Sequence, residues 1–310
     1  MSTARRRPAR ICAVAAAIAL ACVACSSGAA PAHRSSSGPP SGTPTSTSAP
    51  ATSTPPATPS TRPATTSHGP SAAQIRAAKR VRALAGARGH SGYSVAIRDT
   101  TTGATFSTGA TSGMYEGSIA KVDIAETLML QHQQRHTALS SSDRQLVTAM
   151  IEHSDNNAAN TLWTREGGRE AVGKANATLG LRHTTLGPGI YWGFTRTSAT
   201  DQLALLQALV EKHGPLTDAS QYYVLHLMRN VESDQRWGVA TLADDPDDTS
   251  LKNGWLASSL DDNRWLVDSL GIVRRHGHTY LMAVLTQHGS SFAGGIDLVQ
   301  DIARAALPGV

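Results

Sequence analysis

The chain has 310 residues and a formal net charge of +5, with 28 Lys and Arg residues against 23 Asp and Glu residues. Four arginines lie in the first ten residues, and removal of residues 1–24 would take the charge from +5 to +1, so the basic character gives no support for nucleic-acid binding. All three cysteines lie before residue 26, which excludes a disulfide framework and a cysteine-ligated metal site in the rest of the chain.

Residues 1–25 are predicted to be an export signal. An arginine cluster precedes the apolar stretch ICAVAAAIALACVAC, which is too short to span a membrane comfortably. The sequence CVACSSG resembles a bacterial lipoprotein processing site, which implies that Cys25 becomes the lipidated first residue of the mature protein. A transmembrane anchor, cleavage before Cys22 and simple secretion are the alternatives. The prediction is an exported protein anchored by lipid at the outer face of the cell membrane.

Residues 26–70 consist almost entirely of Ser, Thr, Pro, Ala and Gly. Such a segment has too little apolar surface to offset the entropy of ordering it, so we expect a disordered tether. At about 3 Å per residue its reach is on the order of 100 Å. The tether would hold residues 71–310, a length suited to one folded domain, away from the membrane.

The periodicity of residues 71–310 predicts an α/β (α+β) fold. A helix is expected in SAAQIRAAKRVRALAGARG, followed by two strands in GYSVAIRDTTTGATFSTG that turn at Thr102-Gly103. Residues 117–230 are mostly helical in period. Three more strands are expected in TSLKNGWL, NRWLVDSLGIVRR and TYLMAVLTQHG, and a last helix in FAGGIDLVQDIARAAL. These elements predict an antiparallel five-stranded sheet flanked by helices plus an all-helical subdomain, with a cleft between the layers.

A serine and a lysine three residues apart open an apolar helical run at residues 116–130, EGSIAKVDIAETLML. Ser118 and Lys121 would share one helix face, and a serine at a helix N-terminus lies near partly positive backbone N–H groups. Burial lowers the pKa of a lysine, and a neutral amine can act as the base for a serine hydroxyl. The pattern predicts a serine nucleophile, although an accidental pair on a solvated helix face remains the alternative.

Two further motifs follow in the chain. Ser154-Asp155-Asn156 lies between two predicted helices, and Lys252-Asn253-Gly254 lies on a predicted strand. A second Lys-x-Gly at residues 212–214 precedes Pro215 and is interpreted as a helix end. The order of the three motifs resembles that of the penicillin-recognising serine hydrolases, in particular the class A β-lactamase-like group. SDNNAANTLW, GGREAV and TRTSATDQLALLQAL extend the resemblance, which covers about residues 75–308.

The resemblance implies roles for the first two motifs. Ser118 would be the acylated nucleophile, and Lys121 the base that activates it. Ser154 would pass a proton to the leaving nitrogen. Asn156 would hydrogen-bond the amide side chain of the substrate.

The third motif would complete the site. By the same resemblance Lys252, Asn253 and Gly254 would form the substrate-binding strand, with Lys252 holding the substrate carboxylate and helping to keep Lys121 neutral. The oxyanion hole would consist of the backbone N–H groups of Ser118 and of Trp255, the residue after Gly254. No cofactor or metal is implied.

The chain departs from the class A pattern in several places. It has no Asp or Glu between Glu170 and Asp201, where class A enzymes carry the glutamate that activates the deacylating water, and the equivalent position falls close to Ile190. Glu166 and Glu170 belong to the preceding helix and are expected to be solvated. Between Lys252 and Gly254, Asn253 stands where the class A pattern has a Thr or Ser. Ser118 and Ser154 are 36 positions apart, which is closer than in typical class A enzymes.

The sequence therefore predicts a cell-surface serine acyl-hydrolase that acts on β-lactams or related amides, with slow deacylation. A D-alanyl-D-alanine carboxypeptidase or penicillin-binding protein is the closest alternative, because it needs no such glutamate. A module that binds peptidoglycan or a β-lactam without turnover is the alternative from another class. The expected partners are a β-lactam or a peptidoglycan stem peptide and, through the lipid, the membrane.

Overall fold

The structure, a computed structural model, describes residues 69–89, 92–258 and 261–310. The predicted export signal at 1–25, with Cys22 and Cys25, and all of the predicted tether at 26–70 except its last two residues lie outside this range. The described residues belong to one compact unit of the chain. They contain no helix that is long and apolar enough to cross a membrane.

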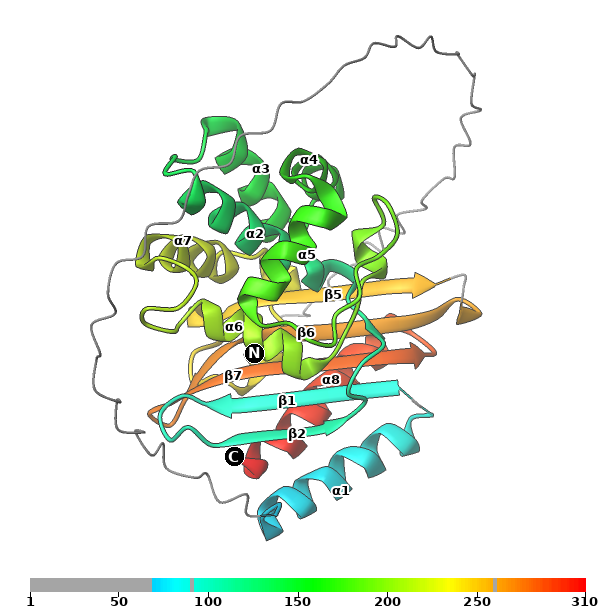
Figure 1. Cartoon of the computed structure of the whole chain (residues 1–310). Helices are drawn as coiled ribbons and strands as arrows, with labels where there is room; N and C mark the ends of the chain where they lie inside the picture. The colour runs from blue at the N-terminus through cyan, green and yellow to red at the C-terminus, as the bar shows by residue number, and fades with distance from the viewer. Residues whose placement is uncertain (1–68, 90–91, 259–260) are drawn as a thin grey trace, which may run out of the picture. The chain divides into compact units, whose positions relative to one another are not determined.

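The predicted antiparallel five-stranded sheet is confirmed. Its strand order is β2-β1-β7-β6-β5, and all neighbouring strands are antiparallel (Figure 1). The strand β5 that carries the Lys-x-Gly motif therefore lies at an edge, with Gly254 opposite Asp268 of β6. The strands are β1 (Gly92–Asp99), β2 (Thr105–Gly109), β5 (Ser250–Ser258), β6 (Arg264–Arg275) and β7 (His278–Gly289). A two-stranded sheet of β3 (Met114–Tyr115) and β4 (Arg196–Thr197), which the sequence did not predict, lies beside the cleft loops.

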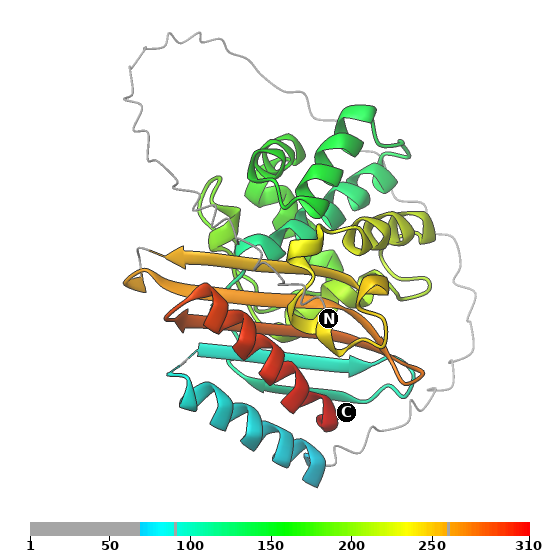
Figure 2. The same cartoon turned by 180° about the vertical axis from the view of Figure 1, so that it is seen from behind.

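Helices cover both faces of the five-stranded sheet. Figure 1 shows α8 behind the sheet, and the reverse view in Figure 2 shows α1 and α8 together in front of it, with α2 to α7 forming the helical subdomain on the other side. The helices are α1 (Ala72–Ala87), α2 (Ala120–Gln134), α3 (Ser141–Glu152), α4 (Asn156–Glu166), α5 (Gly168–Leu179), α6 (Ala199–Ala208), α7 (Asp218–Arg229) and α8 (Phe292–Ala306). The predicted all-helical subdomain is thus confirmed.

The two outer helices form where the sequence places caps before amphipathic runs. Ser71 and Gln74 form a reciprocal capping box at the start of α1. Ser291 caps α8 by accepting a hydrogen bond from the backbone N–H of Gly294. Apolar residues of α8 such as Leu298 and Ile302 are buried against the sheet. This packing fixes the sheet on which β5 lies.

Helix α2 runs through the interior of the helical subdomain, and every residue from Ala120 to Leu130 is buried. The buried residues include Lys121, Asp123 and Glu126 as well as the apolar ones. Burial of charged groups is costly unless they are paired or neutral, so α2 is an unusual place for ionisable side chains. The first turn of this helix is where the predicted nucleophile and base lie.

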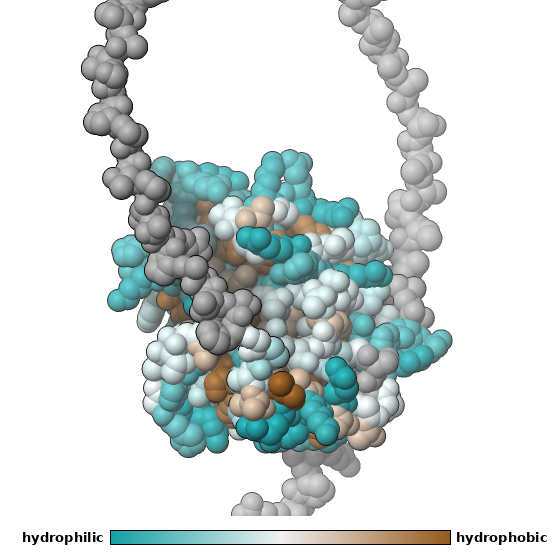
Figure 3. Space-filling view, turned by 60° about the horizontal axis from the view of Figure 1, so that its bottom comes forward, coloured by the Kyte–Doolittle hydropathy of each residue, from teal (hydrophilic) through white to brown (hydrophobic). Residues whose placement is uncertain are grey.

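The described surface has few large exposed apolar side chains. Figure 3, in which the lower side of Figure 1 is turned forward, shows apolar side chains scattered among hydrophilic ones. The largest exposed apolar residues are Ile75, Ile190, Tyr191 and Tyr222. Ile190 and Tyr191 are neighbours in the loop between α5 and β4, which borders the predicted site.

Candidate active site

Ser118 and Lys121 lie at the start of α2, as predicted. Ser118 is in a 3-10 turn, η1 (Gly117–Ile119), that continues into α2, and Lys121 is the second residue of the helix. Lys121 Nζ lies 2.9 Å from Ser118 Oγ. Ser118 is partly exposed, whereas the side chain of Lys121 is fully buried. A substrate can therefore reach the serine while the amine stays out of bulk water.

Two glycines allow the turn η1 and the strand β5 to approach each other closely. A Cβ on Gly254 would lie 2.7 Å from the carbonyl oxygen of Glu116 and 3.0 Å from the backbone N of Ser118. Gly117 has a φ of +49°, and a Cβ there would lie 3.4 Å from the backbone N of Trp255. The two predicted oxyanion donors, the N–H groups of Ser118 and Trp255, thus belong to backbones in direct contact.

The Ser154-Asp155-Asn156 motif lies between α3 and α4, as predicted. Asp155 caps α4 by accepting a hydrogen bond of 2.7 Å from the N–H of Ala158. Ser154 has a φ of +55°, in the left-handed region that non-glycine residues seldom adopt. Strained backbone of this kind persists where surrounding contacts fix it. Here Lys121 donates to the carbonyl oxygen of Ser154 at 2.6 Å.

Lys121 Nζ is surrounded by four oxygen atoms. Besides Ser118 Oγ and the Ser154 carbonyl, it lies 3.0 Å from Ser154 Oγ and 2.8 Å from Asn156 Oδ1. Two of the four, the carbonyl and the amide oxygen, can only accept hydrogen bonds, and a neutral amine has two N–H groups to give them. Its lone pair then faces the hydroxyl groups. The arrangement suits a neutral amine that accepts a proton from Ser118.

Lys252 joins this network from the strand β5. Its Nζ donates to Ser154 Oγ at 3.0 Å and to the Asn253 carbonyl at 3.1 Å, and its side chain is fully buried. Ser154 Oγ therefore lies 3.0 Å from each of the two lysine nitrogens. A hydroxyl in this position can relay a proton from one amine to another group in the cleft.

Both lysines have lowered pKa values. Burial, together with the positive charge of Lys252, lowers the pKa of Lys121 from 10.5 to about 6, although nearby Asp155 opposes the shift. Burial lowers the pKa of Lys252 from 10.5 to about 7. Desolvation disfavours the charged form of an amine, and here it outweighs the hydrogen bonds that the amine donates. Lys121 is mainly neutral at pH 7 and can act as a base.

Asn253 is buried between Lys252 and Gly254, and its side chain contacts protein rather than open space. Its amide Nδ2 donates to the carbonyl oxygens of Gln235 at 2.7 Å and Trp237 at 3.3 Å. Asn253 was predicted as a substrate-binding residue. In the structure its amide group holds residues 235–237 beside β5.

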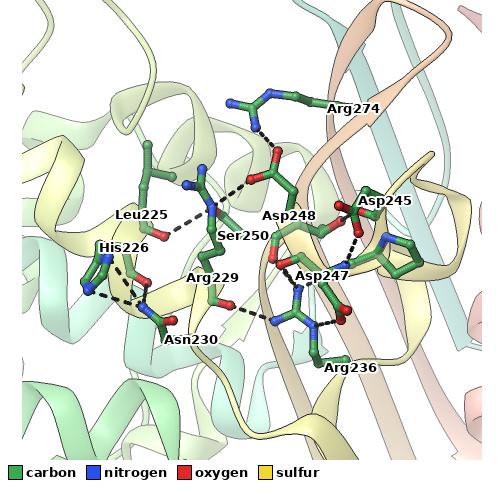
Figure 4. A network of polar contacts seen from close by, with 12 residues as sticks. Leu225, His226, Arg229, Asn230, Arg236, Asp245, Asp247, Asp248, Ser250 and Arg274 are labelled. Carbon is green, nitrogen blue, oxygen red and sulfur yellow. Dashed lines mark hydrogen bonds and ion pairs between the residues drawn. The ribbon is translucent and has the colours of Figure 1, made fainter.

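Arg236 fixes the same segment from the other side. Figure 4 shows its guanidinium among backbone carbonyls: Nη1 donates to Arg229 O at 2.8 Å, and Nη2 donates to Asp247 O at 2.9 Å and Thr249 O at 3.0 Å. In the same network Asp248 forms ion pairs with Arg229 and Arg274. These contacts hold the chain that leads into β5, so the hydrogen bonds of Arg236 stabilise the fold.

The loop between α5 and β4 contains no acidic residue and places an aromatic ring against Lys121. The position of the class A glutamate was predicted to fall close to Ile190, but Ile190 is 60% exposed, and the loop residue that contacts the site is Trp192. The Trp192 ring centroid lies 5.0 Å from Lys121 Nζ. Its Nε1 donates to Asn160 Oδ1 of α4 at 2.8 Å. Sequence reasoning missed Trp192, although a tryptophan inside the glycine-rich stretch GPGIYWGF is a residue that seeks burial.

The prediction that Glu166 is solvated is wrong, whereas the prediction for Glu170 is confirmed. Glu170 is exposed and pairs with Lys174 at 2.7 Å. Glu166 is buried, and its two carboxyl oxygens have no hydrogen-bond partner among the described residues. Burial and the proximity of Asp123 raise its pKa well above the usual range. Glu166 lies at the end of α4 against α2, where tertiary packing overrides the usual exposure of glutamate.

Two more buried carboxyl groups lie behind the nucleophile. Glu116 precedes Gly117 and accepts a hydrogen bond from Gln202 Nε2 at 3.0 Å. Asp268, opposite Gly254 on β6, accepts one from the N–H of Thr286 at 2.9 Å. Burial raises the pKa values of both carboxyl groups well above their usual range. Asp123 and Asp201 add to the rise for Glu116, and Glu116 adds to the rise for Asp268. The neutral form of both carboxyl groups is therefore favoured behind the oxyanion donors.

The side chain of Trp255 belongs to an aromatic cluster on the α8 side of the sheet. Its ring centroid lies 5.9 Å from that of Trp237 and 5.4 Å from that of Phe292, and Trp265 lies 5.5 Å from Phe292. All four rings are partly exposed. Trp255 therefore contributes a backbone N–H next to Ser118 and an aromatic ring to the α8 side of the sheet.

The fold and the site together define a class of protein. The five-stranded sheet with its helical subdomain, and a serine and a lysine hydrogen-bonded at the start of a central helix, are those of a β-lactamase-like protein of the serine hydrolase type. The chain belongs to the beta-lactamase enzyme family, whose sequence profile matches residues 129–309, more than half of the chain. The match begins after Ser118 and Lys121, so the placement of these two residues depends on the geometry. The predicted class A β-lactamase-like superfamily is confirmed.

Individual relatives agree with this assignment. A protein of Mycobacterium tuberculosis described as "Putative lipoprotein LppW" is 27% identical over 222 residues, which cover 69% of each chain. The structure of the TLA-1 extended spectrum β-lactamase has a TM-score of 0.65 at 14% identity and covers 75% of this chain and 97% of its own. The class A β-lactamase from Mycobacterium abscessus has a TM-score of 0.60 at 17% identity, with 74% and 98% covered. At such identities the structures show a common fold alone.

Proposed function

We propose that the chain is an exported serine acyl-hydrolase that forms an acyl-enzyme on Ser118 with β-lactams or related amides. One observation carries the proposal: Lys121 Nζ lies 2.9 Å from Ser118 Oγ, and the pKa of Lys121 is lowered to about 6. An adjacent base within hydrogen-bond reach is what activates a serine hydroxyl. The site thus holds a nucleophile together with a base that is neutral at physiological pH.

Acylation follows from this geometry. Ser118 Oγ attacks the amide carbonyl carbon, and its proton passes to the lone pair of Lys121 Nζ. The developing oxyanion accepts hydrogen bonds from the N–H groups of Ser118 and Trp255, which exist before the substrate binds and need no rearrangement. As the C–N bond breaks, Ser154 Oγ gives its proton to the leaving nitrogen. Lys121, 3.0 Å away and now protonated, restores the proton to Ser154.

Substrate contacts come from the two sides of the cleft. Asn156 uses its Oδ1 on Lys121 and is exposed, so its NH2 group is free to bind an amide carbonyl of the substrate. Lys252 and the Gly254 backbone border the cleft on β5, where Lys252 would hold a carboxylate. The loop between α5 and β4 offers Trp192 beside Lys121 and no carboxylate that could activate water, which supports slow deacylation.

A second candidate is a D-alanyl-D-alanine carboxypeptidase or penicillin-binding protein. The same absence of an acidic residue from the loop, which contains Ile190, Tyr191 and Trp192, favours it, because acylation by a peptide needs only the nucleophile, the base and the oxyanion donors. A module that binds peptidoglycan or a β-lactam without turnover would use the same contacts. In each case the substrate is a small β-lactam or a stem peptide of the cell wall.

Incubation with a fluorescent penicillin tests the proposal. A covalent label located on Ser118 by mass spectrometry supports it, and Ser118→Ala should take no label. Thr161→Ala, a change on the exposed face of α4, is a matched control that should label like the wild type. A label on Ser154, an undiminished label in Ser118→Ala, or hydrolysis without dependence on Ser118 would refute the assignment.

We also propose that the protein is lipid-anchored through Cys25 at the outer face of the cell membrane. The basic and apolar residues of 1–25 and the sequence CVACSSG support this location. The mycobacterial relative is named as a lipoprotein, which agrees with it. Residues 26–70 would then place the catalytic domain within the cell wall, where stem peptides occur.

A further inference from the structure

The Trp192 ring covers Lys121 Nζ on one side, in addition to the oxygen atoms that surround this nitrogen. The amine nitrogen has four oxygen neighbours at 2.6–3.0 Å, from Ser118, Ser154 and Asn156. The Trp192 ring lies over the same nitrogen with its centroid 5.0 Å away. Only 7% of the Trp192 surface is exposed. The indole is therefore packed into the site and is no part of the outer rim.

The space between the ring and the amine is too small for a water molecule. A water bound there would need about 2.8 Å to the nitrogen and about 3.5 Å to the ring atoms. The total of about 6 Å exceeds the 5.0 Å that is present. Between the Trp192 ring and Lys121 Nζ there is therefore no position for a water molecule.

The loop that carries Trp192 is fastened to the helical subdomain at two points. Trp192 Nε1 donates to Asn160 Oδ1 at 2.8 Å, and Trp163 Nε1 of α4 donates to the carbonyl oxygen of Gly189 at 3.1 Å. The loop also lies on the nucleophile turn, because a Cβ on Gly193 would be 3.9 Å from the carbonyl oxygen of Gly117. The ring cannot leave Lys121 without breaking these contacts.

We propose that Trp192 is a positioning residue that keeps water away from Lys121 in the acyl-enzyme, so that the ester on Ser118 is long-lived. The inference rests on the proposed acylation of Ser118. Hydrolysis requires that a water oxygen adds to the ester carbonyl while its proton passes to Lys121 Nζ. The bond between the carbonyl carbon and Ser118 Oγ then breaks, and Lys121 returns the proton to Ser118 Oγ, which leaves a free carboxylic acid. Trp192 removes the place from which that water would be activated.

The chain thereby differs from an enzyme that has merely lost a glutamate. An empty position would fill with water, and Lys121 could then activate it slowly. A packed indole excludes water, so the site favours retention of the acyl group over its hydrolysis. The structure assigns Trp192 to that role and leaves the tip of the loop, Ile190 and Tyr191, exposed beside the cleft.

Release of a preformed label tests the proposal. The full-length chain is labelled with a fluorescent penicillin, excess reagent is removed, and loss of label is followed over time. We expect Trp192→Ala to release the label at least about tenfold faster, within the factor of 10²–10⁴ that a positioned general base contributes. Trp192→Phe should stay within about threefold of the wild type. Tyr191→Ala, an exposed aromatic on the same loop, is the matched control and should release label at the wild-type rate.

The readouts separate this role from simple damage to the fold. Acylation rate constants should stay within about threefold of the wild type in Tyr191→Ala. In Trp192→Ala and Trp192→Leu, water beside Lys121 weakens the desolvation that lowers its pKa, so acylation at pH 7 should slow while release of the label speeds up. General disorder would slow acylation without faster release of the label. Hydroxylamine, a small neutral nucleophile, should speed release from Trp192→Ala but not from the wild type. Trp192→Leu, which keeps more apolar volume, gives the same test if the Ala variant does not fold.

The outcomes also separate the two proposals. A wild-type chain that takes no label overturns the proposed function and this inference with it. A chain that takes the label but loses it no faster after Trp192→Ala or Trp192→Leu refutes the role of Trp192 alone. Equal acceleration by Tyr191→Ala would assign the effect to the loop as a whole and would also refute it.

Discussion

The titration of Lys121 should control the rate of acylation. Its pKa is lowered from 10.5 to about 6 by burial and by the charge of Lys252. A shift of about 4.5 units corresponds to about 6 kcal/mol in favour of the neutral amine. About nine in ten molecules then hold a neutral Lys121 at pH 7, against about 0.03% for an unshifted lysine, which is a difference of about 3,000-fold in active base.

The assay is stopped-flow measurement of the second-order rate constant for acylation by a chromogenic cephalosporin between pH 4.5 and 9. The neutral form is the base, so the rate constant should rise with pH, reach half its maximum near pH 6 and reach its plateau near pH 7. It should fall at higher pH, where Lys252 loses the charge that holds the substrate carboxylate. Lys252→Ala removes a positive charge beside the base. It should therefore move the midpoint to higher pH, and it should lower the plateau because a substrate contact is lost.

Lys174→Ala is the control, since Lys174 is exposed and forms an ion pair with Glu170 on α5. Its profile should match that of the wild type. A wild-type midpoint above pH 8 would mean that Lys121 is charged at neutral pH and is not the base. A midpoint that moves to lower pH in Lys252→Ala would contradict the coulombic argument.

Three further predictions concern the oxyanion donors, the buried acids and the anchor. Gly254→Ala should slow acylation by about 10²–10³ in the same stopped-flow assay, because its Cβ would lie 2.7 Å from the Glu116 carbonyl and force β5 away from Ser118; wild-type rates would rule out this contact. Burial raises the pKa of Asp123 from 3.8 to about 7. Between these two pH values the folded state keeps a proton that the unfolded state releases. The free energy of unfolding should therefore fall by up to about 4 kcal/mol between pH 4 and 7. Urea unfolding at pH 5 and pH 8 measures this difference, and Asp123→Asn should lack the part of it that Asp123 causes. An equal loss of stability between the two pH values in wild type and variant would refute the prediction. Cys25→Ser should release the domain from membranes or block its processing, whereas wild-type protein that never incorporates labelled lipid would point to simple secretion.

The sequence predicted the parts of the site that depend on regular spacing. Ser118 and Lys121 lie one turn apart because an i, i+3 pair shares a helix face. The strand with Lys252 and Gly254 was recognisable from alternation and flanking turns. The order of the motifs then placed three distant segments in one cleft, and the structure brings Ser154 within 3.0 Å of both lysines.

What the sequence did not predict depends on tertiary packing. Trp192 and Ile190 are two residues apart in an irregular loop, and only the contact of the indole with α4 decides which of them turns inward. Glu166 has the sequence context of a solvated helix residue, yet its helix face packs on α2. The sequence pattern of one helix does not show which polar residue becomes buried, because the packing against a second helix decides it.

The burial that lowers the pKa of Lys121 also explains the buried acids around it. Five carboxyl groups in and around α2 have raised pKa values, and charge coupling links Asp123 to Glu116, Glu126 and Glu166, and Glu116 to Asp268. An ionised carboxylate nearby would favour the ammonium form of Lys121 and weaken the base. Desolvation raises the pKa values of these acids as it lowers that of Lys121, so the same dry interior favours the neutral form of both kinds of group. The lower pH limit of acylation is then set by the titration of Lys121.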